Sequence, residues 1–194
     1  WRTGQRAENR RRAQCMVKRR MGASCFNRFW THILMKVTQD ELNAVRSAVC
    51  AVTDPEYPDL TIQQLGILEN VVADSEGIRV DLVPTISGCP ALQTIEQDVR
   101  SAAEACGYEI KVRFCSSPVW TPDRISDDAR IFLAKEYSVA IRPKSGSVEC
   151  PICGKSSLQH RSDVGPTACR SVEWCPDCRN PIEVVRSRRQ PSDG

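Results

Sequence analysis

Cys150-Pro-Ile-Cys153 and Cys175-Pro-Asp-Cys178 are two CxxC pairs with 21 residues between them, in the last third of a chain of 194 residues. Two residues between cysteines allow both thiolates of a pair to reach one metal ion, and two such pairs form the tetrahedral four-thiolate site of a zinc ribbon. Iron accepts the same tetrahedral thiolate set, and two disulfides would consume the same cysteines, so both alternatives stay open. We favour a structural zinc ribbon over residues 150–185, with four ligands: Cys150, Cys153, Cys175 and Cys178.

Four other residues of the predicted ribbon bear on this site. Gly154 and Asn180 follow the two cysteine pairs, and both residue types tolerate the left-handed backbone that such turns need. Cys169 lies between the pairs, and we expect it to pack near the zinc, with a further metal ligand or a free thiol as the alternatives. Because four cysteines already fill the metal shell, we expect His160 to be a surface residue.

The cysteine content indicates the compartment. The chain holds 11 cysteines, an odd number, and four of them have metal-ligand spacing. This pattern favours a reducing cytoplasm with metal chemistry over a disulfide-bonded secreted protein. The apolar runs are only a few residues long, so we expect no membrane span, and no secretory signal is recognisable.

Positive charge is concentrated at the start of the chain. Residues 1–34 carry nine Lys or Arg and one acid, Glu8, whereas the formal net charge of the whole chain is +3. The other residues are therefore net acidic, which argues against nucleic acid as the main partner. Residues 1–34 resemble a nucleic-acid arm or a transit peptide in composition, but we favour a disordered or non-native extension ahead of a start at Met35.

The segment 35–138 has the pattern of an α+β domain of order αββαβ with one further short helix. Thr38 and Glu41 have the spacing of a capping box, and apolar residues then recur at helical spacing until Asp54-Pro55, where we expect the helix to stop. The later elements are expected in this order: strands over 61–73 and 78–83 joined by a turn at 74–77, a helix from Pro90 to Cys106, a strand over 108–115 and a helix from Ser126 to Tyr137.

The strand–helix–strand order predicts that the last two strands are parallel. Residues 139–149 are predicted to be a linker to the ribbon, because they contain Pro143, Ser145, Gly146 and Ser147. Residues 186–194 are polar and are predicted to be a flexible tail.

Cys89 is the second candidate for chemistry. It directly precedes Pro90, so it should lie at the N-cap or N′ position of the predicted helix, where unpaired N–H groups and the helix dipole lower a thiol pKa. A thiolate there would be a nucleophile or a soft metal ligand. The alternative is a cysteine that merely caps the helix. Gly88 permits close backbone approach, and Thr85 offers a hydroxyl in the same loop.

The loop Asp54-Pro-Glu-Tyr-Pro58 carries two carboxylates on a backbone stiffened by two prolines. Asp54 and Glu56 would lie beside the Cys89 loop if both loops leave the same edge of the small sheet. On the residues alone, the simpler interpretation is a proline-stopped helix end with solvated acids.

These pieces together resemble a known family. The loop at Asp54 and Glu56, the segment Thr85-Ile-Ser-Gly-Cys-Pro90 and the αββαβ order are similar to the iron–sulfur assembly domain of SufT-type and cytosolic iron–sulfur targeting proteins. Joined to a ribbon with Gly165-Pro-Thr-Ala-Cys169, they resemble the PaaD (PaaJ) family of the phenylacetyl-CoA epoxidase system. The likeness extends from about Met35 to Val185, although Ile182-Glu-Val-Val185 replaces the family's aromatic-rich last strand.

The resemblance implies a non-catalytic accessory protein that matures or maintains an iron–sulfur centre in aerobic phenylacetate breakdown. Its client would be an oxygenase component, with the iron–sulfur reductase subunit preferred, and a homodimer is compatible with it. By position, Cys89 would be the reactive cysteine that transiently holds iron or a cluster, and Asp54, Glu56 and Thr85 would support it. Two other functions stay open: a zinc-ribbon module that binds nucleic acid or docks a protein, and a thiol redox enzyme using Cys89.

Overall fold

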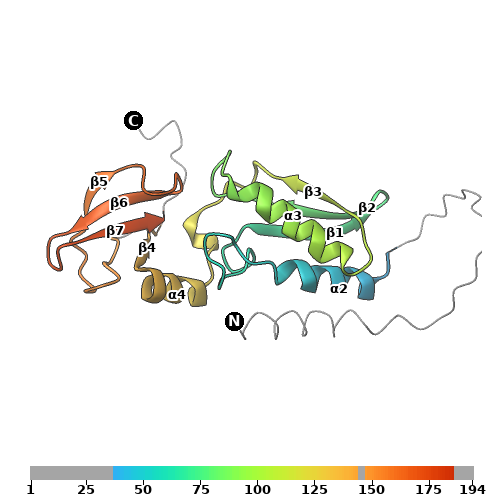
Figure 1. Ribbon diagram of the computed structural model, residues 1–194, viewed down its shortest axis with the longest axis horizontal. Coiled ribbons are helices and arrows are strands. Elements are labelled where there is room, and N and C mark those ends of the chain that lie inside the picture. Colours follow the sequence, from blue (N-terminus) through green and yellow to red (C-terminus); the bar gives the residue numbers. More distant parts are fainter. Residues whose placement is uncertain (1–36, 144–146, 186–194) are drawn as a thin grey trace, which may run out of the picture.

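In the computed structural model, residues 37–143 and 147–185 are described. The N-terminal unit, residues 37–115, contains α2 (Gln39–Cys50), β1 (Leu68–Asp74), β2 (Gly77–Leu82), α3 (Ala91–Glu104) and β3 (Ile110–Phe114). Its sheet has the order β1-β2-β3, and α2 and α3 pack against each other and against the sheet (Figure 1). The predicted αββαβ order is therefore confirmed. The predicted extension over 1–34 and tail over 186–194 lie outside the described residues.

Helix α2 begins as predicted. Thr38 is the N-cap, its hydroxyl accepts from the N–H of Glu41, and the Glu41 carboxylate accepts from the N–H of Thr38. The helix ends at Cys50, four residues before Asp54, so the predicted stop at Asp54-Pro55 is too late. The chain turns earlier because Val52 accepts a hydrogen bond from Ile62 and Thr53 bridges to Thr61 across the loop between them.

The strand predicted over 61–73 is wrong in its first half, because residues 62–66 form turns. The Thr61 hydroxyl bonds to the side chain and N–H of Gln64, and the Thr61 carbonyl accepts from Leu65. Gly66 has φ of 66°, which no strand uses. Local side-chain bonds of this kind compete with the extended backbone that the apolar composition favoured. Only Leu68–Asp74 pairs as a strand.

The turn at 74–77 and the parallel pairing of β2 with β3 agree with the predictions. Asp74 lies opposite Gly77 in the antiparallel β1–β2 ladder, and Ile78 lies opposite Ile110 in the parallel β2–β3 ladder. Helix α3 buries Ile95 and Val99 against the sheet. Pro90 is its N-cap and not its first helical residue, which places Cys89 one position before the cap.

The remainder of the chain forms a short 3₁₀ turn η2 (Pro122–Arg124), α4 (Asp127–Tyr137), β4 (Val139–Ile141), β5 (Gln159–Ser162), β6 (Arg170–Cys175) and β7 (Asn180–Val185). The second sheet has the order β4-β7-β6-β5. Strand β4 lies in the segment predicted as a linker, and it pairs in parallel with β7. The ribbon, residues 150–185, thus gains an edge strand from outside it.

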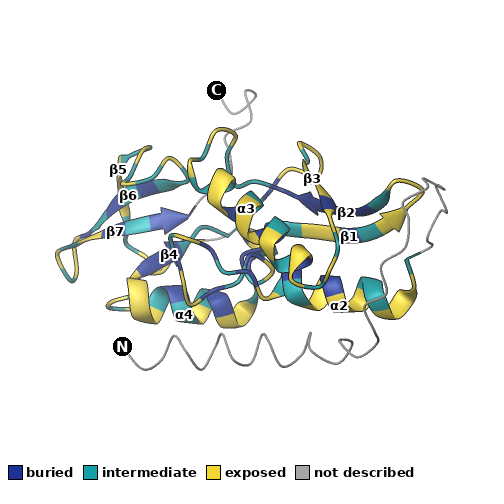
Figure 2. Cartoon of the chain, turned by 45° about the vertical axis from the view of Figure 1, so that its right-hand side comes forward, coloured by how far each residue is buried: buried dark blue, intermediate teal, exposed yellow. Residues whose placement is uncertain are grey.

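The two sheets share part of one core. Val139 of β4 and Val185 of β7 pack in the same apolar cluster as Leu133 of α4 and the buried residues of the N-terminal unit. A second, smaller cluster surrounds the cysteines and includes Ile182 and Val184. Figure 2 shows buried stretches in β2, β4, β6 and β7, with α4 next to β4. No helix among the described residues is long and apolar enough to span a membrane.

Candidate functional site

The four cysteines of the CxxC pairs lie together at one end of the ribbon. All four Sγ atoms lie within 4.8 Å of one another. The Sγ atoms of Cys150 and Cys178 are 3.6 Å apart, as are those of Cys153 and Cys175. A tetrahedron with metal–sulfur bonds of about 2.3 Å has sulfur–sulfur edges of about 3.8 Å, so the set fits a metal ion. A disulfide needs about 2.05 Å, and all four cysteines are free thiols.

Backbone turns hold these cysteines in place. The N–H of Gly154 donates to the carbonyl of Cys150, and the N–H of Arg179 donates to that of Cys175. Gly154 has φ of 71°, as predicted, but in the second turn Arg179 has φ of 57° and Asn180 begins β7 instead. The backbone N–H of Cys178 lowers the pKa of the Cys175 thiol to about 6, whereas burial raises the pKa of the Cys150 thiol.

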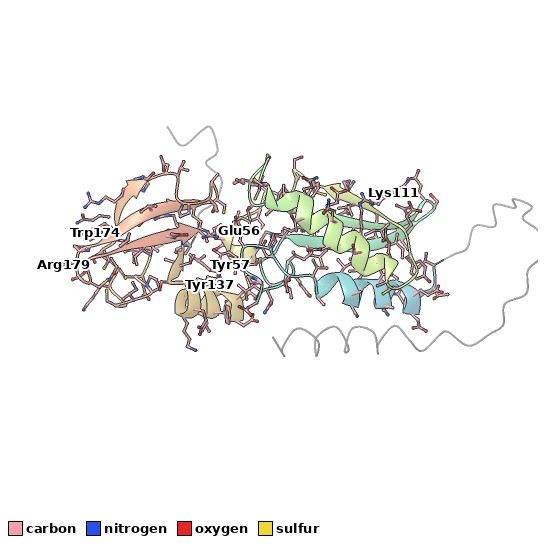
Figure 3. The ribbon with its side chains drawn as sticks, viewed as in Figure 1. Glu56, Tyr57, Lys111, Tyr137, Trp174 and Arg179 are labelled. Atoms are coloured by element: carbon pink, nitrogen blue, oxygen red, sulfur yellow. The ribbon has the colours of Figure 1, made fainter. Side chains whose placement is uncertain are left out.

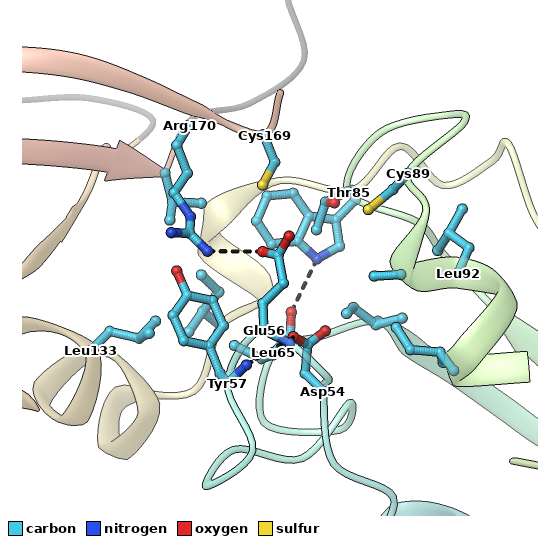
Figure 4. Close-up of a pocket in the computed structure, with 16 residues that line it drawn as sticks. Asp54, Glu56, Tyr57, Leu65, Thr85, Cys89, Leu92, Leu133, Cys169 and Arg170 are labelled. Atoms are coloured by element: carbon cyan, nitrogen blue, oxygen red, sulfur yellow. Dashed lines mark hydrogen bonds and ion pairs between the residues drawn. The ribbon is translucent and has the colours of Figure 1, made fainter. Parts of the chain in front are cut away.

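A second site lies between the N-terminal unit and the ribbon (Figure 4). It is a pocket with about 580 Å³ of free space, counting its open mouth. Its walls are mostly apolar, and Leu65, Ile95 and Trp120 contribute to them. The Trp120 side chain is buried, and its indole N–H donates to the carbonyl of Leu65 at 3.0 Å.

The predicted candidates Asp54, Glu56, Thr85 and Cys89 all line this pocket. The hypothesis that the acidic loop lies beside the Cys89 loop therefore holds in the structure. Cys89 is half-buried, and Figure 4 shows its sulfur turned into the pocket. What these residues do there stays a proposal.

The environment of Cys89 differs from the expectation in one respect. Burial raises the pKa of the Cys89 thiol, and the nearby Glu56, Cys169 and Asp54 raise it further, whereas the N–H of Ala91 opposes the shift only in part. The expected lowering by the helix start is therefore wrong, because desolvation disfavours the thiolate more than the backbone donor favours it. Cys89 rests as a thiol.

Asp54 is not the solvated acid of the simpler interpretation. Its side chain is buried, and Oδ1 accepts from the N–H groups of Glu56 at 2.8 Å and Tyr57 at 3.1 Å. Burial raises the pKa of this carboxyl despite the two donors. The two hydrogen bonds form an Asx turn, which fixes how the side chains of Glu56 and Tyr57 enter the pocket.

Glu56 and Tyr57 connect this turn to the ribbon through Arg170. The Arg170 guanidinium pairs with Glu56 at 2.8 Å and with Glu183 at 2.6 Å, and it lies over the Tyr57 ring at 4.7 Å. Tyr57 also packs edge-on against Tyr137 of α4, with 5.0 Å between the ring centroids. Figure 3 shows Glu56, Tyr57 and Tyr137 between the two units. Sequence reasoning missed Arg170, although it directly follows Cys169 in the ribbon motif.

The structure places Cys169 at this pocket and not at the cysteine cluster, so the expected packing near the metal is wrong. Cys169 directly precedes β6, at the end opposite Cys175, so the length of the strand separates it from the cluster. His160 is exposed, as expected, and lies 3.5 Å from Asp163.

Comparison with known proteins assigns the same two parts. Residues 42–113 match the family model described as an iron-sulfur cluster assembly protein, and residues 134–186 match the PaaD zinc beta ribbon domain. The chain is 31% identical over 163 residues to a protein of Escherichia coli (strain K12) that is named as a putative subunit of 1,2-phenylacetyl-CoA epoxidase. This similarity covers 79% of this chain and 97% of that protein.

Two further similarities each cover half of this chain or less. The "Fe-S protein maturation auxiliary factor" of Porphyromonas gingivalis is 33% identical over 85 residues, which cover 42% of this chain and 80% of that protein. A solved domain of unknown function, DUF59, from Bacillus anthracis is 29% identical with a TM-score of 0.45, covering 50% of this chain and 94% of that one.

Proposed function

This chain belongs to the PaaD family, and from that premise we propose that it is a non-catalytic accessory protein that matures or maintains an iron–sulfur centre of a phenylacetyl-CoA epoxidase system. The observation that carries the proposal is the joint presence of both family domains with Cys89 in the pocket between them. The client would be an oxygenase component, with the iron–sulfur reductase subunit preferred.

Cys89 would bind the iron or iron–sulfur cargo transiently. Its raised pKa supports transient binding, since a thiol that rests protonated must lose its proton to bind and regains it on release. The pocket wall around it is largely apolar, and apolar surroundings limit access of water to a metal–sulfur unit. Asp54 and Glu56 would orient the loop beside the cargo, and the Thr85 hydroxyl would contribute a hydrogen bond.

The cysteine cluster would hold zinc as a structural ion. Zinc with four thiolates has no open position, so it would stabilise the ribbon and take no part in cargo transfer. Cys150, Cys153, Cys175 and Cys178 would be its ligands, in agreement with their mutual distances. In this proposal the cysteine cluster has a structural role, and the pocket binds the cargo.

The proposal is tested with Cys89→Ser in cells whose phenylacetyl-CoA epoxidase activity depends on this protein. Cys89 is only half-buried, so the variant should fold and retain its ribbon metal, while support of the epoxidase falls at least tenfold. Cys50→Ser, a half-buried cysteine outside the pocket, is the matched control. Full support by Cys89→Ser would refute the role of Cys89.

A further inference from the structure

Two cysteines from different parts of the chain face the same pocket. Cys89 precedes α3 of the N-terminal unit, and Cys169 precedes β6 of the ribbon. Both line the pocket, and both are half-buried free thiols. Figure 4 shows both sulfur atoms turned toward the space between the two units. The fold thus brings together thiols that are 80 positions apart in the sequence.

The pocket also holds polar groups that lack partners. The Tyr57 hydroxyl and the Arg170 Nε are buried, and neither has a hydrogen-bond partner in the described part of the chain. Tyr57 is 7% exposed. Both residues line the pocket, and buried hydroxyl and guanidinium donors are nearly always paired, so these two atoms indicate a ligand or ordered water at the pocket.

The charges of the pocket suit a cationic centre with thiolate ligands. Asp54 and Glu56 present carboxylates, and the one guanidinium among the described lining residues, that of Arg170, is already shared between Glu56 and Glu183. Negative charge near two thiols favours a bound cation. The Thr167 hydroxyl lies 3.1 Å from the Cys169 sulfur, where it can donate to a thiolate and stabilise it.

We propose that Cys89 and Cys169 are the two protein ligands of one iron–sulfur cargo site, so that the cargo is held jointly by the N-terminal unit and the ribbon. This inference rests on the proposed function and deepens it, because the ribbon becomes part of the cargo site. Each thiol loses a proton to solvent as its sulfur–iron bond forms. Iron–sulfur units usually have four protein or thiol ligands, so two positions stay open for the thiolates of a client or a small thiol.

The arrangement explains how cargo would leave. A client that fills the two open positions with thiolates and supplies two more can replace Cys89 and Cys169 one after the other, by ligand exchange without any change of oxidation state. Both thiols then regain protons from solvent. The Arg170 bridge holds the ribbon end that carries Cys169 against the N-terminal unit, because it ties the turn at Glu56 to the first residue of β6.

The test uses the full chain, prepared without oxygen and supplied with ferrous iron, sulfide and a reducing thiol. Iron, sulfide and zinc per chain and the visible absorption spectrum are measured for wild type, Cys89→Ser, Cys169→Ser and the control Cys50→Ser. We expect wild type and the control to hold iron and sulfide. Both pocket variants should hold at least tenfold less iron and sulfide, and zinc per chain should be the same in all four proteins. Unchanged iron and spectrum in Cys169→Ser, with iron lost in Cys89→Ser, would overturn the inference and leave the role of Cys89 intact.

A second measurement needs no variant and covers the case in which Cys169→Ser does not fold. Wild type is alkylated with iodoacetamide with and without the iron–sulfur cargo, and the modified cysteines are mapped by mass spectrometry. We expect the cargo to protect both Cys89 and Cys169, and Cys50 to be modified equally in both samples. Equal modification of Cys169 in both samples overturns the inference. A wild type that takes up no iron also overturns it, and the accessory function is then judged by epoxidase activity alone.

Discussion

Arg170 contacts acidic and aromatic side chains from both units. Its guanidinium reaches Glu56 in the Asx turn and Glu183 in β7, while its plane covers Tyr57. The Arg170 side chain is 11% exposed, so these charge pairs are screened less than surface pairs. Arginine suits this position because its planar fork binds two carboxylates at once, which lysine cannot do in the same geometry.

Arg170→Met should lower the free energy of unfolding by about 2 kcal/mol, because it leaves two partly buried carboxylates without their cation. The measurement is urea denaturation of the full chain. Arg161→Met is the control, since Arg161 is exposed and bonds only to Gln159 among the described residues. Equal stabilities of the two variants would contradict the bridging role.

Asp54 gives a pH-dependent stability with a definite sign. Its pKa is raised on folding by burial, so the folded state binds its proton more tightly than the unfolded state does. The contribution of Asp54 to stability is therefore most favourable below the ordinary value of 3.8 and falls as the pH rises through the folded pKa. Asp54→Asn keeps the acceptor of the Asx turn and removes the charge.

We expect the free energy of unfolding of Asp54→Asn, relative to wild type, to increase as the pH rises above about 4. Urea denaturation at several pH values measures this difference. Asp74→Asn is the control, since Asp74 also accepts from a backbone N–H two residues ahead but is exposed. A difference for Asp54→Asn that is constant over this pH range would refute the burial of a charge at this position.

At the scale of elements, the turn over residues 62–66 shapes the pocket, and the strand β4 joins the ribbon sheet to the preceding helix. The turn places Leu65 and Ile67 in the pocket wall and presents the Leu65 carbonyl to Trp120. Strand β4 extends the ribbon sheet and brings α4 against it. Neither feature was predicted, and each joins segments that are distant in the sequence.

Gly66→Ala should be strongly destabilising, by more than about 2 kcal/mol, for two reasons. Gly66 has φ of +66°, and a Cβ atom there would lie 2.4 Å from the Cβ and 2.6 Å from the carbonyl oxygen of Arg124. Gly77→Ala is the control, because Gly77 also has positive φ but no atom within 4 Å of the added Cβ. Thermal unfolding of both variants should show the larger loss at Gly66. Equal losses would show that backbone strain alone determines the cost.

At the scale of the whole molecule, the ribbon is integrated with the N-terminal unit. Val139 and Val185 pack in the larger core, and Arg170 adds an ionic bridge at the pocket. Unfolding of the ribbon should therefore also change the structure of the pocket. The turn between β1 and β2 lies at the end of the N-terminal unit that is far from this contact, as Figure 1 shows.

Removal of the ribbon metal with a strong chelator should unfold the ribbon, because the metal joins both CxxC turns and the apolar cluster around the cysteines is small. Hydrogen exchange measured by mass spectrometry should show lost protection over residues 150–185 and partial loss over 54–57, with β1 and β2 unchanged. Restored zinc should restore protection. Unchanged protection over 150–185 after verified metal removal would refute a structural metal there.

The order of elements in the N-terminal unit and the identity of the clustered cysteines were predictable from local signals. Capping residues, proline, glycine and the alternation of apolar residues act over a few positions, and CxxC spacing determines which thiolates can share one ion. The extent of the strand before Leu68 was not predictable in this way, because side-chain bonds at Thr61 outweigh the strand propensity of its apolar neighbours.

The amino-acid sequence by itself determined that the chain has an assembly-type unit followed by a four-cysteine ribbon, and it marked Cys89, Asp54 and Glu56 as candidates. Only the tertiary structure decided that Cys169 and Arg170 belong beside them and that Cys89 rests as a thiol. The physical reason is that helix starts and cysteine spacing are local, whereas desolvation and ion pairing depend on which distant segments pack together. The packing of the ribbon against the N-terminal unit places Cys169 and Arg170 at the pocket, and the residue pattern of neither unit alone predicts that contact.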